Sequence, residues 1–480
     1  MNTTLQHSAR TRDRMFNRLA GLLGAALVLA TLAIPTGVAN AATKPTPKPT
    51  AKASTPAKKP AKPAPVKITG AITVWSGFTQ GPRAVYMEKI ARQFESDYPG
   101  TKVTIQTMSW GQFGTKWPTA LATGQLPDVS TALPNQVVQM INVDALAPMS
   151  DLINSIGRKR FDAKPLSEGV RANVNYSLPL YSHAQVMWYR KDLLAKAGLS
   201  APPQTWDELK AAAVKLTKDG VYGLSVPMGT NDLMASRFLN FYVQSGGESL
   251  INKNGTANLT SKLAIDGIKY WVDMYKQTSP KGSVSYNVLD QATLFYQGKT
   301  AFDFNSGFQI SGVASTTPGL ENNIAAAPLP RLKSSDPVYG GETSNIAAVV
   351  WKQSKNQAAA KAFLKLILDD KYYVEFLRSI PGGMLPVLND VADTVGFAAE
   401  PTVMKFRDSI NVIRQAIPLG TAIGMERGPI VQSGIIAGQG IIEAMFQDIV
   451  LNNKAVEQAA ADTEAKLNQM FVASGAKFNR

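Results

Sequence analysis

The chain has 480 residues, of which 45% are hydrophobic and 18% are charged, and its formal net charge is +15. It contains no cysteine, which excludes disulfides, thiol nucleophiles and a lipid-modified cysteine as a membrane tether. Eleven basic residues and one acid precede Ile68, so the remaining 413 residues carry a charge of only +5. Because the basic excess lies in the terminal segment and not on the folded part, we expect no nucleic-acid partner.

Residues 1–41 have the pattern of a secretory signal peptide. Four arginines stand near the start, an apolar run extends from Leu19 to Ile34, and Ala39-Asn40-Ala41 supplies the small residues of a cleavage site. The apolar run is shorter than the ~20 residues that a membrane-spanning helix needs. We therefore predict export, cleavage after Ala41, and a periplasmic or cell-surface location. Retention of the segment as an uncleaved anchor is the alternative.

Residues 42–67 form a second segment, with seven lysines, seven prolines and no acid. Proline removes backbone donors and like charges repel each other, so this segment cannot pack into a core. We predict a semi-rigid spacer that reaches at most ~80 Å at ~3.1 Å per residue. Attraction to an anionic wall polymer or to lipid headgroups is an alternative role for it.

The folded part begins with the pattern of a strand, a helix and a second strand. Ala71–Trp75 is a short β-rich run. A helix follows, because apolar residues recur at the spacing of one helix face: Met87, Ile90, Ala91 and Phe94. The turn at 98–100 ends this helix, and Val103–Ile105 reads as the second strand. This order within about 35 residues predicts a parallel strand pair covered by a helix.

The same alternation returns after residue 180. Val186–Tyr189 is strand-like, and Thr205–Glu208 has the sequence of a capping box at a helix start. Trp271 lies on the apolar face of a helix with Ile268, Val272 and Tyr275, so we predict that it is a core residue. Residues 358–368 and 455–471 read as further amphipathic helices. The predicted fold class is α/β, with parallel or mixed sheets in two lobes.

Six stretches, in this order along the chain, resemble extracellular solute-binding protein family 1, the maltose-binding-protein-like carbohydrate-binding subunits of ABC importers. They are Ile72–Trp75, Leu121–Val129, Leu178–Tyr181 with Val186–Leu193, Pro202–Leu209, Phe295–Gly307, and Gly340-Gly341. The resemblance implies the two-lobed, type II periplasmic-binding-protein-like fold, with mixed sheets joined by hinge strands. It implies one lobe of residues 68–180 plus 331–366, and another of 184–326 plus 370–480.

The resemblance also implies an action. Such proteins close around one small-molecule carbohydrate, as monomers, and deliver it to the permease subunits of an ABC transporter. The late segment 432–440 departs from the family, because it offers neither a stacking tryptophan nor a phosphate-holding arginine. That departure counts against an anionic ligand and against a large oligosaccharide. We therefore expect a neutral carbohydrate, from a monosaccharide to a short oligosaccharide, or a polyol. A receptor for glycerol 3-phosphate or a glycerophosphodiester, and a wall-associated lectin without a transporter, remain the alternatives.

A sugar site needs aromatic planes and fixed polar groups in a cleft. Trp75 is a candidate because it stands where a strand exits, the place where ligands bind in open α/β sheets. Phe78, Trp110 and Phe113 follow in loops nearby, and the remaining candidates are placed by the resemblance. These are Asn135, Tyr181, Ser182, His183, Asn305, Phe308, Gly341, Glu342 and, following the strand-ending glycines, Thr343.

We expect no enzymatic activity, no cofactor and no metal. Glycan cleavage needs two carboxyl groups ~5 to 10 Å apart, and Glu342 is the only acid among the candidates. His183 is the only histidine after the predicted signal, which is too few for a histidine metal cluster, and no G-x-S-x-G-like pattern supports a triad. A structural calcium site stays open at the loop 252–255, which reads Asn-Lys-Asn-Gly.

Overall fold

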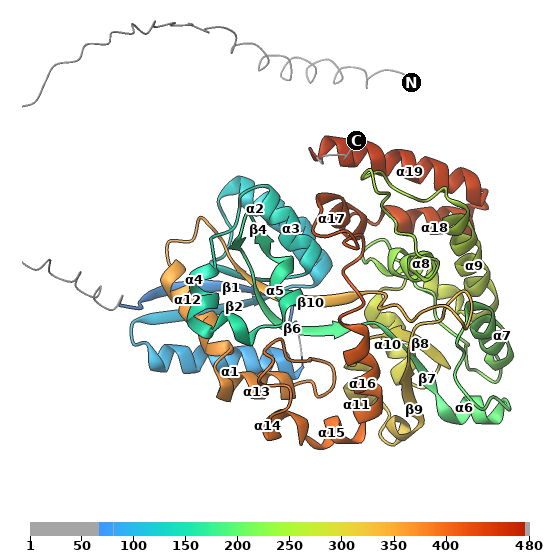
Figure 1. Cartoon of the computed structure of the whole chain (residues 1–480), viewed down its shortest axis with the longest axis horizontal. Coiled ribbons are helices and arrows are strands. Elements are labelled where there is room, and N and C mark those ends of the chain that lie inside the picture. The colour runs from blue at the N-terminus through green and yellow to red at the C-terminus, as the bar shows by residue number, and fades with distance from the viewer. Residues whose placement is uncertain (1–66, 80, 476–480) are drawn as a thin grey trace, which may run out of the picture. The chain divides into compact units, whose positions relative to one another are not determined.

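The computed structural model of the chain describes residues 67–79 and 81–475. The predicted signal peptide and all but the last residue of the predicted spacer lie outside the described residues. The described residues hold two larger sheets and the two-stranded pair of β4 (Val170–Arg171) and β5 (Val174–Asn175), and we call each larger sheet with its helices a lobe (Figure 1).

The first lobe is built on a five-stranded mixed sheet in the order β2-β1-β3-β10-β6. The strands β1 (Gly70–Ser76), β2 (Thr101–Thr107) and β3 (Val129–Ala132) are parallel, and the predicted helix α1 (Pro82–Asp97) connects the first two. The long strand β10 (Thr343–Val350) runs antiparallel to β3 and to β6 (Leu178–Ala184). The predicted strand–helix–strand unit at the start of the fold is therefore confirmed.

Helices cover both faces of this sheet, so successive residues of a strand enter different cores. In β1, Ile72 and Val74 join the cluster that includes α1, whereas Trp75 joins a second cluster on the opposite face. The helices and short elements of this lobe are α2 (Trp110–Thr123), α3 (Pro134–Asn142), α4 (Ser150–Ile156), η1 (Arg158–Arg160), α5 (Ala163–Glu168), β4 (Val170–Arg171), β5 (Val174–Asn175) and α12 (Gln357–Ile367).

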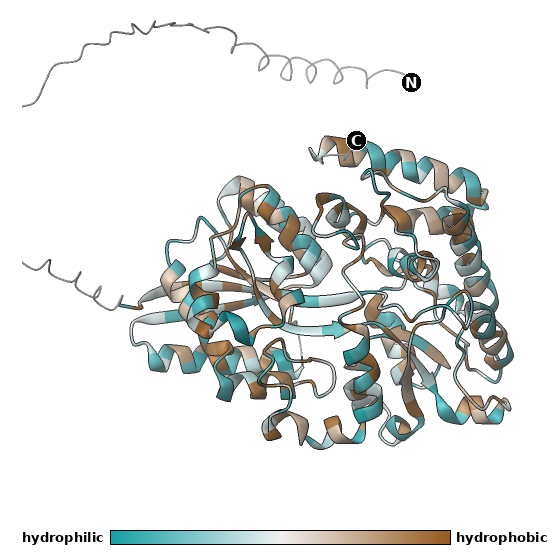
Figure 2. Ribbon diagram, in the orientation of Figure 1, coloured by the Kyte–Doolittle hydropathy of each residue, from teal (hydrophilic) through white to brown (hydrophobic). Residues whose placement is uncertain are grey.

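The second lobe contains an antiparallel sheet in the order β8-β7-β9. Its strands are β7 (Val186–Arg190), β8 (Phe302–Asn305) and β9 (Ile324–Ala327). Its other elements before β10 are α6 (Lys191–Lys196), α7 (Trp206–Leu216), α8 (Met234–Ser245), α9 (Lys262–Thr278), η2 (Lys281–Ser285), α10 (Val288–Tyr296), α11 (Phe308–Thr316) and η3 (Leu320–Asn323). The outer helices alternate hydrophilic and hydrophobic residues along their length, as amphipathic surface helices do (Figure 2).

Two local predictions in this lobe are confirmed. Thr205 and Glu208 form a capping box at the start of α7. Trp271 is fully buried, and its indole Nε1 donates a hydrogen bond to the Phe238 carbonyl oxygen at 2.7 Å. Both predictions rest on residues a few positions apart on one helix, which is the range over which sequence patterns are informative.

The chain passes between the lobes by short connections. Strand β6 continues into β7 with only Gln185 between them, and the segment 328–342 leads from β9 back to β10. Helix α16 (Arg407–Ala416) lies at the junction, where it contacts β6, β7 and β9. Figure 1 shows β6 and β10 extending side by side from the first lobe toward the second.

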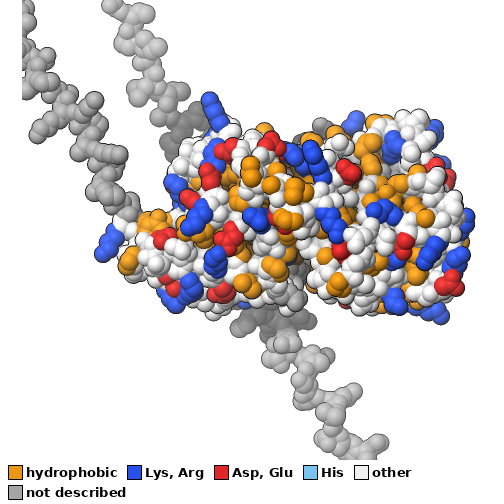
Figure 3. Space-filling model, turned by 90° about the horizontal axis from the view of Figure 1, so that it is seen from below, with side chains coloured by type: hydrophobic (Ala, Val, Ile, Leu, Met, Phe, Trp, Pro, Cys, Tyr) orange, Lys and Arg blue, Asp and Glu red, His pale blue; other side chains and the backbone are white. Residues whose placement is uncertain are grey.

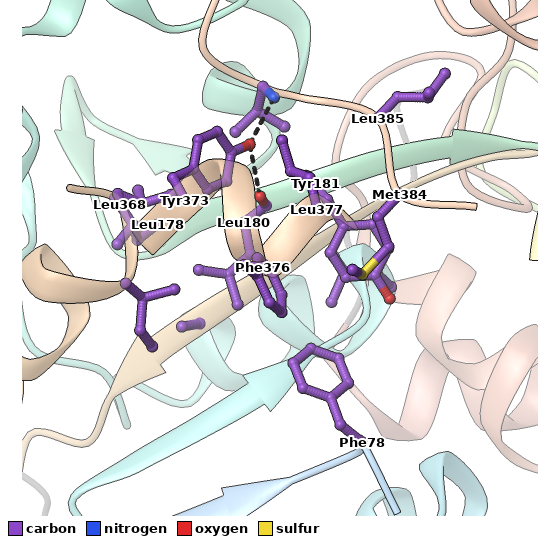
Figure 4. Packing of buried hydrophobic residues seen from close by; sticks show 14 of the residues in the cluster. Phe78, Leu178, Leu180, Tyr181, Leu368, Tyr373, Phe376, Leu377, Met384 and Leu385 are labelled. Atoms are coloured by element: carbon purple, nitrogen blue, oxygen red, sulfur yellow. Dashed lines mark hydrogen bonds between the residues drawn. The ribbon is translucent and has the colours of Figure 1, made fainter. Parts of the chain in front are cut away.

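One predicted boundary needs correction. We expected the second lobe to resume at residue 370, but α13 (Asp370–Arg378) packs against α1 and α12 of the first lobe. The Tyr373 hydroxyl donates to the Leu180 carbonyl oxygen at 2.8 Å and accepts from the Val387 N–H at 2.9 Å (Figure 4). Phe376 and Leu377 pack in the same cluster as Leu180, so burial of the apolar face of α13 keeps it on the first lobe.

The remaining helices are α14 (Val395–Ala398), α15 (Pro401–Lys405), α17 (Val431–Gly438), α18 (Ile441–Asn452) and α19 (Val456–Ala473). The stretch Val431–Asn452 is long and apolar enough to cross a membrane, but 56% of its most apolar window is buried inside the protein. It is also divided into α17 and α18, because Gly440 between them has a positive φ of 60°. These are core helices, of which α17 contacts α2 and α3 of the first lobe and α19 of the second.

Lysine and arginine alternate with acids over the face in Figure 3, without a continuous basic stripe on that face.

Candidate functional site

A cavity of about 200 Å³ lies between the two lobes. Its first-lobe wall comes from α1, from the starts of α2 and α3, and from β6 and β10; its second-lobe wall comes from α8, α10, and the end of β8 with α11. A second cavity of about 410 Å³ shares Trp110, Leu133, Asp232 and Leu233 with it, so the two adjoin beside Trp110.

Seven of the predicted site residues line the first cavity. They are Trp110, Asn135, Tyr181, His183, Asn305, Phe308 and Glu342. The aromatic members form one cluster: the ring centroids of Tyr181 and Phe308 are 6.5 Å apart, and those of His183 and Phe308 are 5.9 Å apart. The structure thus brings together residues that are separated by up to 232 positions in the chain.

Trp75 and Phe113 do not line the cavity. Trp75 is 4% exposed, its ring packs edge-on against Phe113 at 6.4 Å, and its Nε1 donates to Gln106 Oε1 at 2.9 Å. The strand exit that suggested Trp75 is correctly located, but the side chain points to the face of the sheet that α2 covers. Both aromatics are therefore core residues of the first lobe.

Phe78 is fully buried and lies behind two cavity residues. Its ring centroid is 6.4 Å from that of Trp110 and 6.1 Å from that of Tyr181. Gly77 matters for the same packing, because a Cβ at this position would lie 2.5 Å from Cη2 of Trp110. A capping box from Ser109 to Gln112 fixes the helix start that carries Trp110. Phe78 thus supports the cavity wall without forming it.

Ser182, Gly341 and Thr343 are also absent from the lining. The Ser182 hydroxyl donates to Asn345 Oδ1 at 2.5 Å, which ties β6 to β10 at the lobe junction. Thr343 Oγ1 donates to the Ile417 carbonyl oxygen at 3.2 Å. Gly341 has a φ of 56°, and a Cβ there would lie 2.2 Å from Leu329 Cδ1, so this position requires glycine. Its effect is to deliver the next residue, Glu342, to the cavity.

Sequence reasoning missed several charged and polar residues of the cavity: Arg83, Gln185, Asp232 and Arg237. Arg237 of α8 pairs with Glu342 in a buried, bidentate ion pair. Asp232 accepts the backbone N–H groups of Leu233 at 2.8 Å and Val288 at 2.7 Å. The cavity therefore has two acids where we expected one, and both already bind protein donors.

Arg83 could have been found in the sequence from the periodicity of its helix. It stands four residues before Met87, on the same face of α1 as the buried Met87 and Ile90. An arginine on an apolar helix stripe is unusual. In the structure its Nη1 donates to the Tyr181 hydroxyl at 3.0 Å.

His183 is partly buried, and its Nδ1 atom, which is shielded from solvent, has no hydrogen-bond partner among the described residues. Burial, together with the positive charges of Arg237 and Arg83, lowers the pKa of His183 from 6.5 to about 3. The imidazole is therefore neutral at physiological pH and offers a ligand a polar atom without charge.

The geometry does not favour hydrolysis or a metal centre. The two cavity carboxylates are held by an ion pair and by backbone N–H groups, and neither is the free acid that general acid catalysis needs. Among residues 67–79 and 81–475, no group of three or more His, Asp or Glu side chains is placed to hold a metal ion. In the loop proposed for calcium, Asn252 Nδ2 donates to the Ala257 carbonyl oxygen and Asn254 Oδ1 accepts from the Thr256 N–H, so both amides stabilise the turn itself.

The chain matches, over residues 79–374, the model of the family described as bacterial extracellular solute-binding protein. A putative binding protein of Brucella abortus is 27% identical over 309 residues, which are 64% of this chain and 74% of that protein. The diacetylchitobiose-binding protein DasA of Streptomyces coelicolor is 28% identical over 313 residues, which are 63% of this chain and 70% of that protein.

Solved structures share the fold at low sequence identity. An ABC transporter solute-binding protein of Agrobacterium radiobacter K84, in complex with ribitol, aligns with a TM-score of 0.73 and 19% identity over 84% of this chain and 100% of its own. The predicted two-lobed type II periplasmic-binding-protein fold is confirmed by this likeness and by the sheets described above. Only the sheet of the first lobe is mixed, because the strands of β8-β7-β9 all pair antiparallel.

Proposed function

Because the chain belongs to the bacterial extracellular solute-binding protein family, we propose that it is the receptor subunit of an ABC importer. In this proposal it captures a carbohydrate outside the cytoplasm by closing its two lobes, and delivers it, as a monomer, to membrane permease subunits. The observation that carries the proposal is the cavity, whose walls come from both lobes.

The chemistry of the cavity supports a carbohydrate ligand. A sugar ring presents apolar C–H faces and a rim of hydroxyl groups, so it needs aromatic surfaces beside fixed donors and acceptors. Trp110, Tyr181 and Phe308 supply aromatic surfaces, and Asn135, Gln185 and Asn305 supply uncharged polar groups. One relative is named for binding diacetylchitobiose, and a solved structure of the same fold is a complex with ribitol. The adjoining second cavity leaves room for an oligosaccharide.

Closure follows from where these groups are placed. A ligand drives a conformational change only to the extent that it binds one state more tightly than the other. A solute that touches Asn135 and Tyr181 in the first lobe and Asn305 and Phe308 in the second makes its full set of contacts when the lobes are together. The direct passage from β6 to β7 through Gln185 suits a hinge, because a few terminal residues can absorb the rotation.

Thermal melting of the purified protein against a panel of sugars and polyols tests the ligand class, since a solute that binds only the folded state raises the melting temperature. Small-angle scattering with and without the best solute then tests closure, for which we expect a smaller radius of gyration in the bound state. Mass spectrometry should recover the solute unaltered. An unchanged scattering curve would favour a rigid wall-associated lectin, and a cleaved sugar would contradict the assignment as a receptor.

A further inference from the structure

The two arginines that line the cavity differ in their partners. Arg237 is paired with Glu342 and lies within the fields of Asp232 and Glu443, all of which favour its charged form. Arg83 makes no ion pair with any residue in 67–79 or 81–475. A guanidinium is charged at every physiological pH, so one end of the cavity carries a positive charge that no described carboxylate neutralises.

The surroundings of Arg83 hold it in position while using only one of its five N–H donors. Its Cζ lies 4.9 Å from the ring centroid of Phe78 and 4.7 Å from that of Phe308. These contacts stabilise the cation through the ring faces, but they provide no acceptor for the N–H groups, which lie in the guanidinium plane. Of its five N–H donors, only one, on Nη1, binds a described residue, the Tyr181 hydroxyl, and Nε is buried without a partner.

The other polar groups of the cavity offer Arg83 neither a free acceptor nor a free negative charge. Asp232 is occupied by the N–H groups of Leu233 and Val288, and Glu342 is occupied by Arg237. His183 is neutral, because burial and the two arginines lower its pKa to about 3. The free capacity at this end of the cavity is a positively charged, planar set of donors, whose best partner is a planar anion with two oxygens.

We propose that the ligand is an acidic sugar whose carboxylate pairs with Arg83 beside Phe308. This rests on the proposed function, because it assumes that the cavity takes a carbohydrate. The uncharged part of the sugar would then meet Trp110, Asn135 and Asn305. Segment 432–440 has no basic residue, and that absence favoured a neutral ligand. Arg83 of α1 instead brings a positive charge to the cavity from another part of the chain.

Calorimetric titration with matched pairs of sugars tests this proposal. The probes are galacturonate against galactose, glucuronate against glucose, and short oligomers of galacturonate and of mannuronate against oligomers of galactose and of mannose. We expect at least one carboxylated probe to bind about 10- to 100-fold more tightly than its neutral counterpart, the range expected for a hydrogen-bonded charged group. That preference should shrink as the salt concentration rises.

Substitution at Arg83 separates charge from packing. Arg83→Gln should weaken binding of the carboxylated probe more than binding of its neutral counterpart, and so remove most of the preference between them. Arg83→Lys should keep part of it, because lysine retains the charge but loses the planar fork. Arg378→Gln, at an exposed arginine of α13, is the matched control and should change neither. If Arg83→Gln does not fold, the lysine variant and the salt dependence of the original protein still decide the matter.

The outcomes are distinct. Equal or tighter binding of the neutral probes would overturn the acidic-sugar inference and leave the proposed function intact. A preference for galactose 6-phosphate over galacturonate that Arg83→Gln abolishes would overturn the carboxylate in favour of a phosphate. Failure of every probe, neutral and acidic, to bind would overturn the proposed function together with the inference.

Discussion

Arg237 of α8 and Glu342, the residue before β10, form a buried ion pair that joins the second lobe to the strand returning to the first. The distance between Arg237 Nη2 and Glu342 Oε1 is 3.1 Å, and the two side chains are 9% and 6% exposed. The Ser344 hydroxyl donates to the same Oε1 at 3.3 Å. The pair therefore contributes both to the cavity wall and to the junction between the lobes.

Breaking this pair should destabilise the protein strongly. Glu342→Gln leaves Arg237 buried without a countercharge, and we expect the free energy of unfolding to fall by about 3 to 5 kcal/mol in a denaturant titration. The double change Arg237→Met with Glu342→Leu should cost much less than either single change. As a control, Asp266→Asn breaks an ion pair with Lys262, which is 89% exposed, and should cost less than about 1 kcal/mol. If Glu342→Gln and Asp266→Asn lower the free energy of unfolding equally, burial is not what makes the Arg237–Glu342 pair important.

Substitution of Phe308 should affect sugar binding, whereas substitution of Trp75 should affect the stability of the fold. Phe308 lines the cavity, so Phe308→Ala should weaken the best sugar of the thermal panel by about 1 to 3 kcal/mol in calorimetry. Trp75 is buried under α2, so Trp75→Ala should lower the free energy of unfolding by about 3 to 5 kcal/mol. The folded fraction of that variant should still bind the sugar. Normal binding by Phe308→Ala would show that its ring belongs to the core.

His183 should not titrate in the physiological range. In a chain that starts at Ile68 it is the only histidine, so its imidazole proton signal in nuclear magnetic resonance can be assigned without ambiguity. With a pKa of about 3 in the fold, the signal should stay constant from pH 8 to pH 5, whereas in urea it should move with a midpoint near 6.5. Because the unfolded chain gains a proton first, this residue lowers stability as the pH falls from 6.5 toward 3. A folded-state midpoint near 6 would show that the ring is hydrated in the folded protein.

Glu168, at the end of α5, should make stability depend on pH in the opposite sense. Both of its carboxyl oxygens are buried without a partner among the described residues, and burial raises its pKa from 4.5 to about 7. Its contribution to stability is complete below pH 4.5 and is lost as the pH rises through 7.

Glu168→Gln should therefore stabilise the protein at pH 8 by about 2 to 3 kcal/mol and give little gain at pH 4. Denaturant titrations at the two pH values measure the difference. Glu88→Gln, at an exposed position of α1, should show no such dependence. A stability gain that is the same at both pH values would mean that the ionisation of Glu168 is not its cause.

The parts of the fold that were predictable are those set by neighbours along the chain. The apolar stripe of α1 and the capping box of α7 involve residues three or four positions apart, so their effect is visible in the sequence. The placement of α13 was not predictable in this way. Its apolar face could pack on either lobe, and the contacts of Tyr373 with Leu180 and Val387, which are 193 and 14 positions away, decide between them.

The candidate site shows the same division. The resemblance brought Asn135, Tyr181, Asn305 and Phe308 to attention, and the structure places all four around one cavity. The helix pattern missed Arg83, because the apolar positions of α1 were counted from Met87 onward. The charged residue one turn earlier was left out of that count. The strand pattern placed Trp75 at the correct strand end. A shift of one position along a strand, however, reverses the face of the sheet to which a side chain points.

The sequence by itself determined the α/β class, the order of strands and helices, the family resemblance and most of the polar candidates, because period, capping and motif spacing are properties of short stretches. Only the tertiary structure decided which aromatics face the cavity and which the core. It alone paired Arg237 with Glu342, from elements 105 positions apart, and left Arg83 without a countercharge from any residue that the structure describes. A side chain's surroundings depend on elements distant in sequence, and long-range packing, not local pattern, sets its burial and its partners.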